Sequence, residues 1–177
     1  MVLTPEFALL LLLLIPLAAA VLIPLAGKAP NIREAITFVA GFALLGVVIY
    51  LCREVASGGR PELYLGRFAG FFEVKFVLEP LGATFAAIAS SLWIVNSVFT
   101  LGYMRGNNEK NQTRFFMFVA IAIASAMGIA ASGNLITSFI FYEALTISTF
   151  PLVSHKGDAK ARKGLTIYAL ILMGTSL

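Results

Sequence analysis

A series of long, nearly uncharged apolar stretches constrains this chain more than any other feature. Six follow one another within the 177 residues: 7–25, 36–52, 83–104, 115–131, 135–153 and 165–177. A helix needs about 17–25 residues to cross the hydrocarbon core of a bilayer, and only the last stretch is short for a crossing. We therefore predict an all-α integral membrane protein, a single domain with a bundle of about six transmembrane helices. The expected helices span roughly residues 5–26, 34–54, 82–104, 113–132, 134–153 and 162–177.

Composition excludes a soluble domain. Apolar residues make up 59% of the chain and charged residues only 12%, whereas soluble domains carry about 25% charged residues. Too little polar surface remains to face water on all sides, so lipid must contact the outside of the bundle. The net charge of +4 lies in short connections without a basic face, so nucleic-acid binding is not expected. Cys52 is the single cysteine, no nucleotide-binding loop is present, and we expect no metal or cofactor.

A signal peptide is the alternative interpretation of the first stretch, because Ala18, Ala19 and Ala20 resemble a cleavage site. No positive residue precedes this stretch, and it is longer than a typical signal h-region. We therefore expect a retained helix.

The connection between the second and third helices differs from the others. Residues 57–61 have turn composition, and residues 71–78 partly alternate apolar with charged side chains. Alternation with a period of two is typical of a β-strand, so we predict a short β-hairpin within residues 60–80.

The distribution of basic residues predicts the orientation. The first, third and fifth connections hold Lys28, Arg33, Arg105, Lys110, Arg114, Lys156, Lys160, Arg162 and Lys163. The second connection holds Arg53, Arg60, Arg67 and Lys75, which are matched by four glutamates, and the fourth holds none. Because connections rich in Lys and Arg stay in the cytoplasm, we expect a multi-pass protein of the cell inner (cytoplasmic) membrane. Both termini and the hairpin would then be extracytoplasmic.

Glu143 is the candidate for chemistry. The other acidic residues lie in connections or at the edges of the apolar stretches, whereas Glu143 lies near the middle of the fifth stretch. A charged side chain at that depth costs at least about 2.5–3.5 kcal/mol on insertion scales, so such residues usually pair, protonate or face the bundle interior. Glu143 could exchange a proton or pair with a cation, or, as the structural alternative, a protonated Glu143 could hold two helices together by a hydrogen bond.

Polar residues near Glu143 are candidates for supporting roles. Thr146 lies one turn further along the helix and Ser148 lies on the same helix, where hydroxyls could hold water or bond back to the backbone. His155 and Lys156 follow the fifth stretch at the basic edge. His155 is either simply solvated or a proton entrance, because imidazole titrates near neutral pH.

A family resemblance rests on the fifth stretch and the residues after it. Gly133–Leu135, Phe141–Glu143 and Leu145–Val153, followed by His155, Gly164, Tyr168 and Gly174–Ser176, resemble the antiporter-like subunits of respiratory complex I and of Mrp-type cation/proton antiporters, most closely the MrpD-like branch. Upstream, Phe76–Gly82 is similar to the family's start of the third helix, although many members have Asp-Gly where this chain has Glu79-Pro80. The likeness covers the amino-terminal portion of the family only.

The resemblance implies a role for Glu143 and a need for partners. Glu143 matches the family's fifth-helix glutamate, which pairs with a lysine on the seventh helix and takes part in proton transfer. This chain ends in its sixth stretch, so we expect another membrane subunit to supply an intramembrane lysine, with the chain naturally short, split or truncated. The expected partners are therefore other membrane subunits and lipid.

The predicted function is a subunit of a multisubunit membrane complex that translocates protons, with sodium exchange left open. The chain would have no catalytic site of its own, and the complex could be a complex I relative, a membrane-bound hydrogenase or an Mrp antiporter. One alternative is a scaffold subunit that does not conduct. Another is a small self-assembling exporter that couples efflux to protonation of Glu143.

Overall fold

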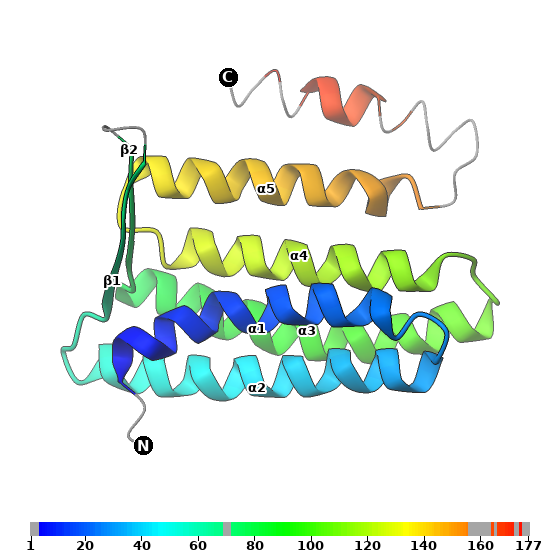
Figure 1. Cartoon of the computed structure of the whole chain (residues 1–177), viewed down its shortest axis with the longest axis horizontal. Helices are drawn as coiled ribbons and strands as arrows, with labels where there is room; N and C mark the ends of the chain where they lie inside the picture. The colour runs from blue at the N-terminus through cyan, green and yellow to red at the C-terminus, as the bar shows by residue number, and fades with distance from the viewer. Residues whose placement is uncertain (1–3, 69–71, 156–163, 165, 172–173, 175–177) are drawn as a thin grey trace.

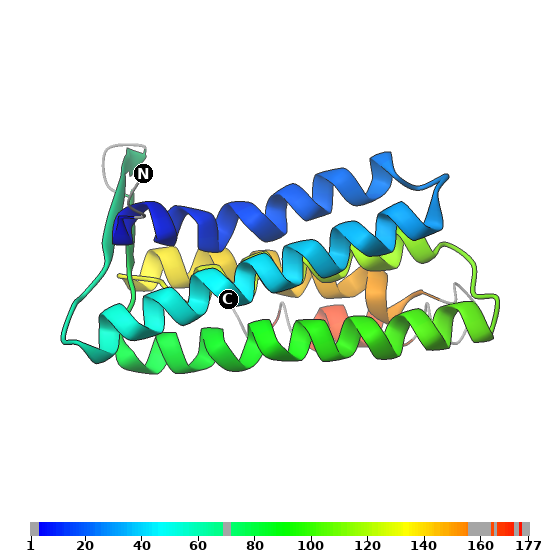
Figure 2. The same ribbon diagram turned by 90° about the horizontal axis from the view of Figure 1, so that it is seen from below.

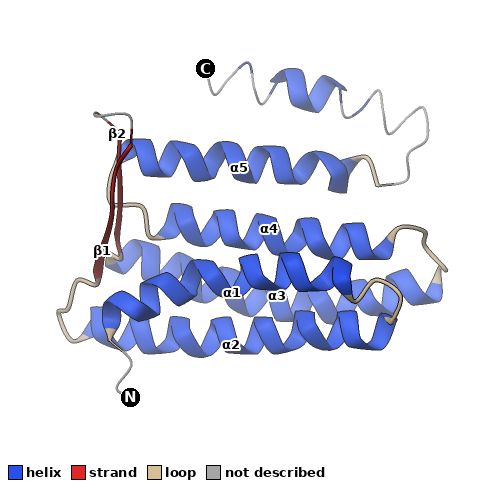
Figure 3. Ribbon diagram, viewed as in Figure 1, coloured by secondary structure: helices blue, strands red, loops and turns tan. Residues whose placement is uncertain are grey.

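The computed structural model describes residues 4–68, 72–155, 164, 166–171 and 174. Within these residues lie five long helices and one antiparallel hairpin, arranged lengthwise with the hairpin across one end (Figures 1 and 3). The helices are α1 (Pro5–Leu25), α2 (Pro30–Ala56), α3 (Pro80–Gly106), α4 (Gln112–Ala130) and α5 (Leu135–Val153). The strands are β1 (Glu62–Phe68) and β2 (Phe72–Val77).

All five helices are long and apolar enough to cross a membrane. The described residues therefore form a mostly helical, multi-pass membrane protein with a small antiparallel hairpin where one was predicted, and the five helices begin and end within a few residues of the expected ranges. Half of the predicted sixth helix, 162–177, lies outside the described residues, and its described part, 164, 166–171 and 174, is helical.

Helices α1 to α4 form a ring around the core. In sequence order each packs on the next, and α1 closes the ring against α4 (Figure 2). The core side chains of this ring are large and apolar, among them Leu12, Ile23, Leu44, Trp93 and Met127. Helix α5 packs on the outside of the ring against α4, so it is covered on fewer sides than the other helices.

Local sequence signals explain where the helices begin. Prolines stand in the first turn of α1, α2 and α3, where the missing N–H is not needed. Helix α5 begins after Asn134, whose side chain accepts a hydrogen bond from the Thr137 amide at 2.7 Å. Helix α2 begins at Pro30, four residues earlier than predicted. The prediction followed the apolar stretch, and the start of α2 lies outside that stretch because it contains the buried Arg33.

The hairpin joins the connection between α4 and α5. The Val77 amide donates to the Ala131 carbonyl at 2.7 Å, and the Gly133 amide donates to the Lys75 carbonyl at 2.8 Å. The Phe76 ring is buried and meets the Phe141 ring of α5 edge to face, with 5.6 Å between centroids. These contacts fix the start of α5, the helix that carries Glu143.

We name the two ends of the molecule by their contents. The hairpin end holds β1, β2 and the α4–α5 connection, whereas the basic end holds the α1–α2 and α3–α4 connections and the last turn of α5. The connections rich in Lys and Arg thus lie together at one end of the molecule. Which side of the membrane each end faces stays a prediction.

Candidate functional site

Glu143 occupies the ninth position of the 19-residue α5, so it lies near the middle of a possible membrane span. Its side chain is half-buried, and its Oε1 atom is buried without a hydrogen-bond partner among the described residues. An unpaired carboxyl oxygen in an apolar environment is unfavourable unless a proton, a cation or water satisfies it.

The face of α5 on which Glu143 lies can be worked out from its neighbours. Phe141 faces α4, because a Cβ atom added at Gly128 of α4 would overlap the Phe141 ring. Glu143 follows two residues later, about 200° around the helix axis, so it lies on the opposite side of α5. Phe150 comes seven residues after Glu143 and returns to within about 20° of it. Glu143 therefore faces away from the α1–α4 ring.

The helical residues 166–171 approach this outer face. The Tyr168 ring meets the Phe150 ring edge to face at 6.0 Å between centroids, and the Tyr168 hydroxyl lies 3.2 Å from the Thr149 hydroxyl. Thr146, buried and one turn from Glu143, lies on the same side within about 60°. The Glu143 side of α5 is thus a partly covered surface and not an open lipid face.

The other predicted residues lie elsewhere. Ser148 is buried about 140° around α5 from Glu143, and its hydroxyl donates to the Leu145 carbonyl at 2.7 Å. Lys156 lies outside the described residues. His155 follows the end of α5 at Val153, and the twelve residues from Glu143 correspond to about 18 Å along a helix axis. Of these residues, only Thr146 therefore shares the side of α5 on which Glu143 lies.

His155 lines a cavity of about 410 Å³ at the basic end, between α3, α4 and the end of α5. Its two ring nitrogens are buried without a hydrogen bond of standard geometry among the described residues, and its ring meets Phe115 edge to face at 5.3 Å. Burial lowers the pKa of His155 and the positive charge of Arg114 adds to this, whereas Glu109 and the Lys110 backbone act in the opposite direction. The cavity is therefore separate from the Glu143 side of α5 and lies where α5 faces α3 and α4.

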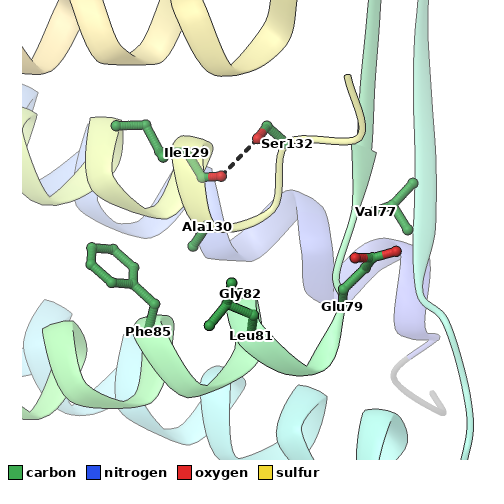
Figure 4. A pocket seen from close by; sticks show the side chains of 8 residues that line it. All are labelled: Val77, Glu79, Leu81, Gly82, Phe85, Ile129, Ala130 and Ser132. Carbon is green, nitrogen blue, oxygen red and sulfur yellow. Dashed lines mark hydrogen bonds between the residues drawn. The ribbon is translucent and has the colours of Figure 1, made fainter. Parts of the chain in front are cut away.

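A second cavity of about 400 Å³ lies at the hairpin end between α3 and the end of α4 (Figure 4). Gly82 approaches the Ala130 carbonyl so closely that a side chain there would overlap it, and the Ser132 hydroxyl donates to the Ile129 carbonyl at 2.8 Å. Its lining is mostly apolar apart from Glu79 and Ser132. We assign this cavity no role.

Sequence reasoning missed a buried charged cluster at the basic end. Arg33 and Glu34, near the start of α2, are 4% and 6% exposed, although both stand at the edge of an apolar stretch. Arg105 from the end of α3 donates through Nε to Glu34 at 3.0 Å, and Arg33 donates to Glu34 at 3.1 Å. The antiparallel pairing of α2 with α3 brings Arg105 to Glu34, which the sequence could have suggested once that pairing was assumed.

Helix α4 completes the cluster. Arg33 donates to the side-chain oxygens of Gln112 at 2.9 Å and Thr113 at 3.1 Å, and its guanidinium lies 5.2 Å from the centre of the Phe116 ring. The cluster therefore ties α2, α3 and α4 together. Among the described residues, no group of three or more His, Cys, Asp or Glu could hold a metal ion.

Comparison with known proteins confirms the predicted resemblance. No family model matches the chain. It is 25% identical to a Na(+)/H(+) antiporter subunit of Alkalihalophilus pseudofirmus, over 93% of this chain and 33% of that protein. It is 26% identical to the NAD(P)H-quinone oxidoreductase subunit 5 of the Paulinella chromatophora chromatophore, over 67% of this chain and 18% of that protein.

A solved structure has the same fold. The chain superposes with a TM-score of 0.82 and 17% identity on a chain of the membrane-bound sulfane sulfur reductase, an archaeal respiratory membrane complex, covering 95% of this chain and 34% of that one. The chain thus resembles the antiporter-like subunits of complex I and Mrp-type antiporters, and it spans about a third or less of the relatives named here.

Proposed function

We propose that this chain is a subunit of a multisubunit membrane complex that translocates protons, in which Glu143 accepts and releases the proton. One observation carries the proposal: a carboxyl group at mid-depth of α5 whose buried oxygen has no partner among the described residues. Carboxylates in such positions usually mark proton or ion pathways. The relatives, which are named as an antiporter subunit and as quinone oxidoreductase subunits, support the same class of function.

The surroundings of Glu143 support a shared site. Because Glu143 faces away from the α1–α4 ring, on a side of α5 that residues 166–171 cover only in part, a side chain from another polypeptide can approach it without disturbing the core. A lysine there would stabilise the ionised carboxylate, and moving that lysine away would favour proton uptake. We infer that a partner subunit supplies this cation, and that the complex lies in the cytoplasmic membrane with the hairpin end outside.

A scaffold role is the second candidate. It is favoured because no ion pair to Glu143 occurs within the part of the chain that the structure describes, so the described residues do not form a charge relay by themselves. A scaffold would use α5 only as a docking surface for neighbouring subunits.

Replacing Glu143 with Gln distinguishes proton transfer from a scaffold role. This change keeps size and hydrogen bonding but removes the exchangeable proton, and Glu6→Gln, which alters an exposed acid at the start of α1, is the matched control. Proton uptake by membrane vesicles and copurification of partner subunits are measured in parallel. Proton transfer predicts lost uptake with intact assembly in the Glu143 variant only, whereas unchanged uptake would refute it and favour the scaffold.

A hydrophobic carbodiimide gives an independent test, because it modifies protonated carboxyl groups in apolar surroundings. We expect Glu143 to react, and the reaction to slow as rising pH ionises the acid. A lack of reaction over the whole pH range would argue against an exchangeable proton at this position.

A further inference from the structure

The charged cluster at the basic end has more positive than negative charge. Arg33 and Arg105 both bind the single carboxylate of Glu34, and no other acid lies within 4.0 Å of either guanidinium among the described residues. Glu109 lies at the same end but lines the His155 cavity. One positive charge is thus left without a protein counter-ion, and the buried Nε of Arg33 has no acceptor in the described part of the chain. A site of this kind calls for an anion.

A cavity of about 420 Å³ opens beside this cluster. It is lined by Pro30, Asn31, Arg105, Asn108 and Gln112, so its only charged lining group is a guanidinium, accompanied by three amides. Arg105 is about half exposed there, and Arg33 lies directly behind through its bond to Gln112. Pro30 and Asn31 also form the first turn of the 27-residue α2, whose positive dipole end points toward the cavity.

The position of the cavity in the fold indicates whether the anion is a lipid headgroup or a free ion. Next to its lining, Ile32 on α2 is 58% exposed, and Val98, which stands seven residues before Arg105 and therefore on the same side of α3, is also 58% exposed. Large apolar side chains pointing outward at the end of two membrane helices fit acyl chains, while the cavity fits a polar headgroup. A free anion in water would gain nothing from this apolar flank.

We infer that the cavity between α2 and the α3–α4 connection binds the phosphate headgroup of an anionic phospholipid. Arg105 would contact the phosphate directly, Asn108 and Asn31 would donate from their amides, and Arg33 would add charge from behind. This inference concerns lipid binding at the basic end and does not rest on Glu143, so it can fail while the proposed function holds.

Native mass spectrometry of the full chain in neutral detergent tests the inference, with phosphatidylglycerol and phosphatidylcholine as probes. The test variant is Arg105→Gln, which can still bond to Glu34, and the matched control is Lys110→Gln, which removes the same charge at the same end of the molecule without altering the cavity lining. We expect Arg105→Gln to weaken phosphatidylglycerol binding more than about tenfold, and Lys110→Gln by no more than the roughly fivefold of diffuse attraction. Equal losses in the two variants, or equal binding of the two lipids, would overturn the site.

Two further arms remove ambiguity. Glu34→Gln leaves both arginines unneutralised and should tighten phosphatidylglycerol binding, whereas weaker binding in a folded variant would contradict the charge argument. Inorganic phosphate should not raise the melting temperature as phosphatidylglycerol does. If inorganic phosphate raises the melting temperature as much as phosphatidylglycerol does, the site binds a free anion and the lipid assignment is wrong.

Discussion

Gly128 of α4 lies where the Phe141 ring of α5 comes closest, and this contact decides how α5 sits on the bundle. A Cβ atom at position 128 would overlap three carbons of the ring, Cγ, Cδ1 and Cε1. Gly128 is buried, so a methyl group added there can be accommodated only if α4 or α5 moves. The perturbation we consider is Gly128→Ala, a single added methyl group.

Two opposing effects set its magnitude. Alanine is favoured over glycine inside a helix by about 1 kcal/mol, while overpacking a close contact costs about 1–3 kcal/mol. Since the overlap involves the body of a ring held between α4 and buried Phe76, we take the upper end and expect a net loss of about 2 kcal/mol. Gly46→Ala in α2, where nothing lies within 4 Å of the added methyl, should gain up to about 1 kcal/mol.

Reversible unfolding in mixed micelles, followed by circular dichroism, measures both free energies of unfolding. Phe141→Ala is added to complete a double-mutant cycle, because truncating the ring removes the overlap. We expect Gly128→Ala to be much less harmful in the Phe141→Ala background, with a coupling of at least about 1.5 kcal/mol. Equal stability of the two glycine variants, or additive effects in the cycle, would refute the packing argument.

Three further predictions test other parts of the molecule. Thr137→Val should destabilise the protein by about 1–3 kcal/mol, since it leaves the Lys75 amide without its 3.2 Å bond to the Thr137 hydroxyl; amide exchange at Lys75 should accelerate, and Ser138→Ala is the control. Burial lowers the pKa of His155, so the folded state prefers the neutral ring. The contribution of His155 to the free energy of unfolding should be full above pH about 6.5 and should be lost as the pH falls toward the lowered pKa of the folded state. The His155→Gln variant should lack this pH dependence. In a Cys52→Ser background, a cysteine at position 107 should be labelled by an impermeant maleimide only from the cytoplasmic side and one at position 57 only from outside; the reverse pattern would contradict the orientation.

Sequence reasoning was most successful where one signal dominates. Helix positions follow from long apolar stretches, and the hairpin from the partial alternation of residues 71–78, which includes the buried Phe76. The burial of Arg33 and Glu34 could not be predicted in the same way, because both look like ordinary loop charges until Arg105 arrives from the far end of α3. Likewise, the contact of Phe141 with Gly128 had to be known before the direction of Glu143 could be worked out.

Glu34 and Glu143 illustrate how surroundings assign different tasks to the same side chain. Glu34 is buried between two guanidinium groups, so its charge is neutralised by fixed partners and it serves to hold α2 against α3 and α4. Glu143 lies at mid-span with a buried oxygen that nothing in the described chain satisfies, on the face of α5 turned away from the ring. A carboxylate between fixed cations is already paired, whereas a buried carboxyl oxygen without them needs a proton, a cation or water to satisfy it. The proposed function depends on this difference in surroundings. Both residues are glutamates, so their side chains alone cannot account for the different roles.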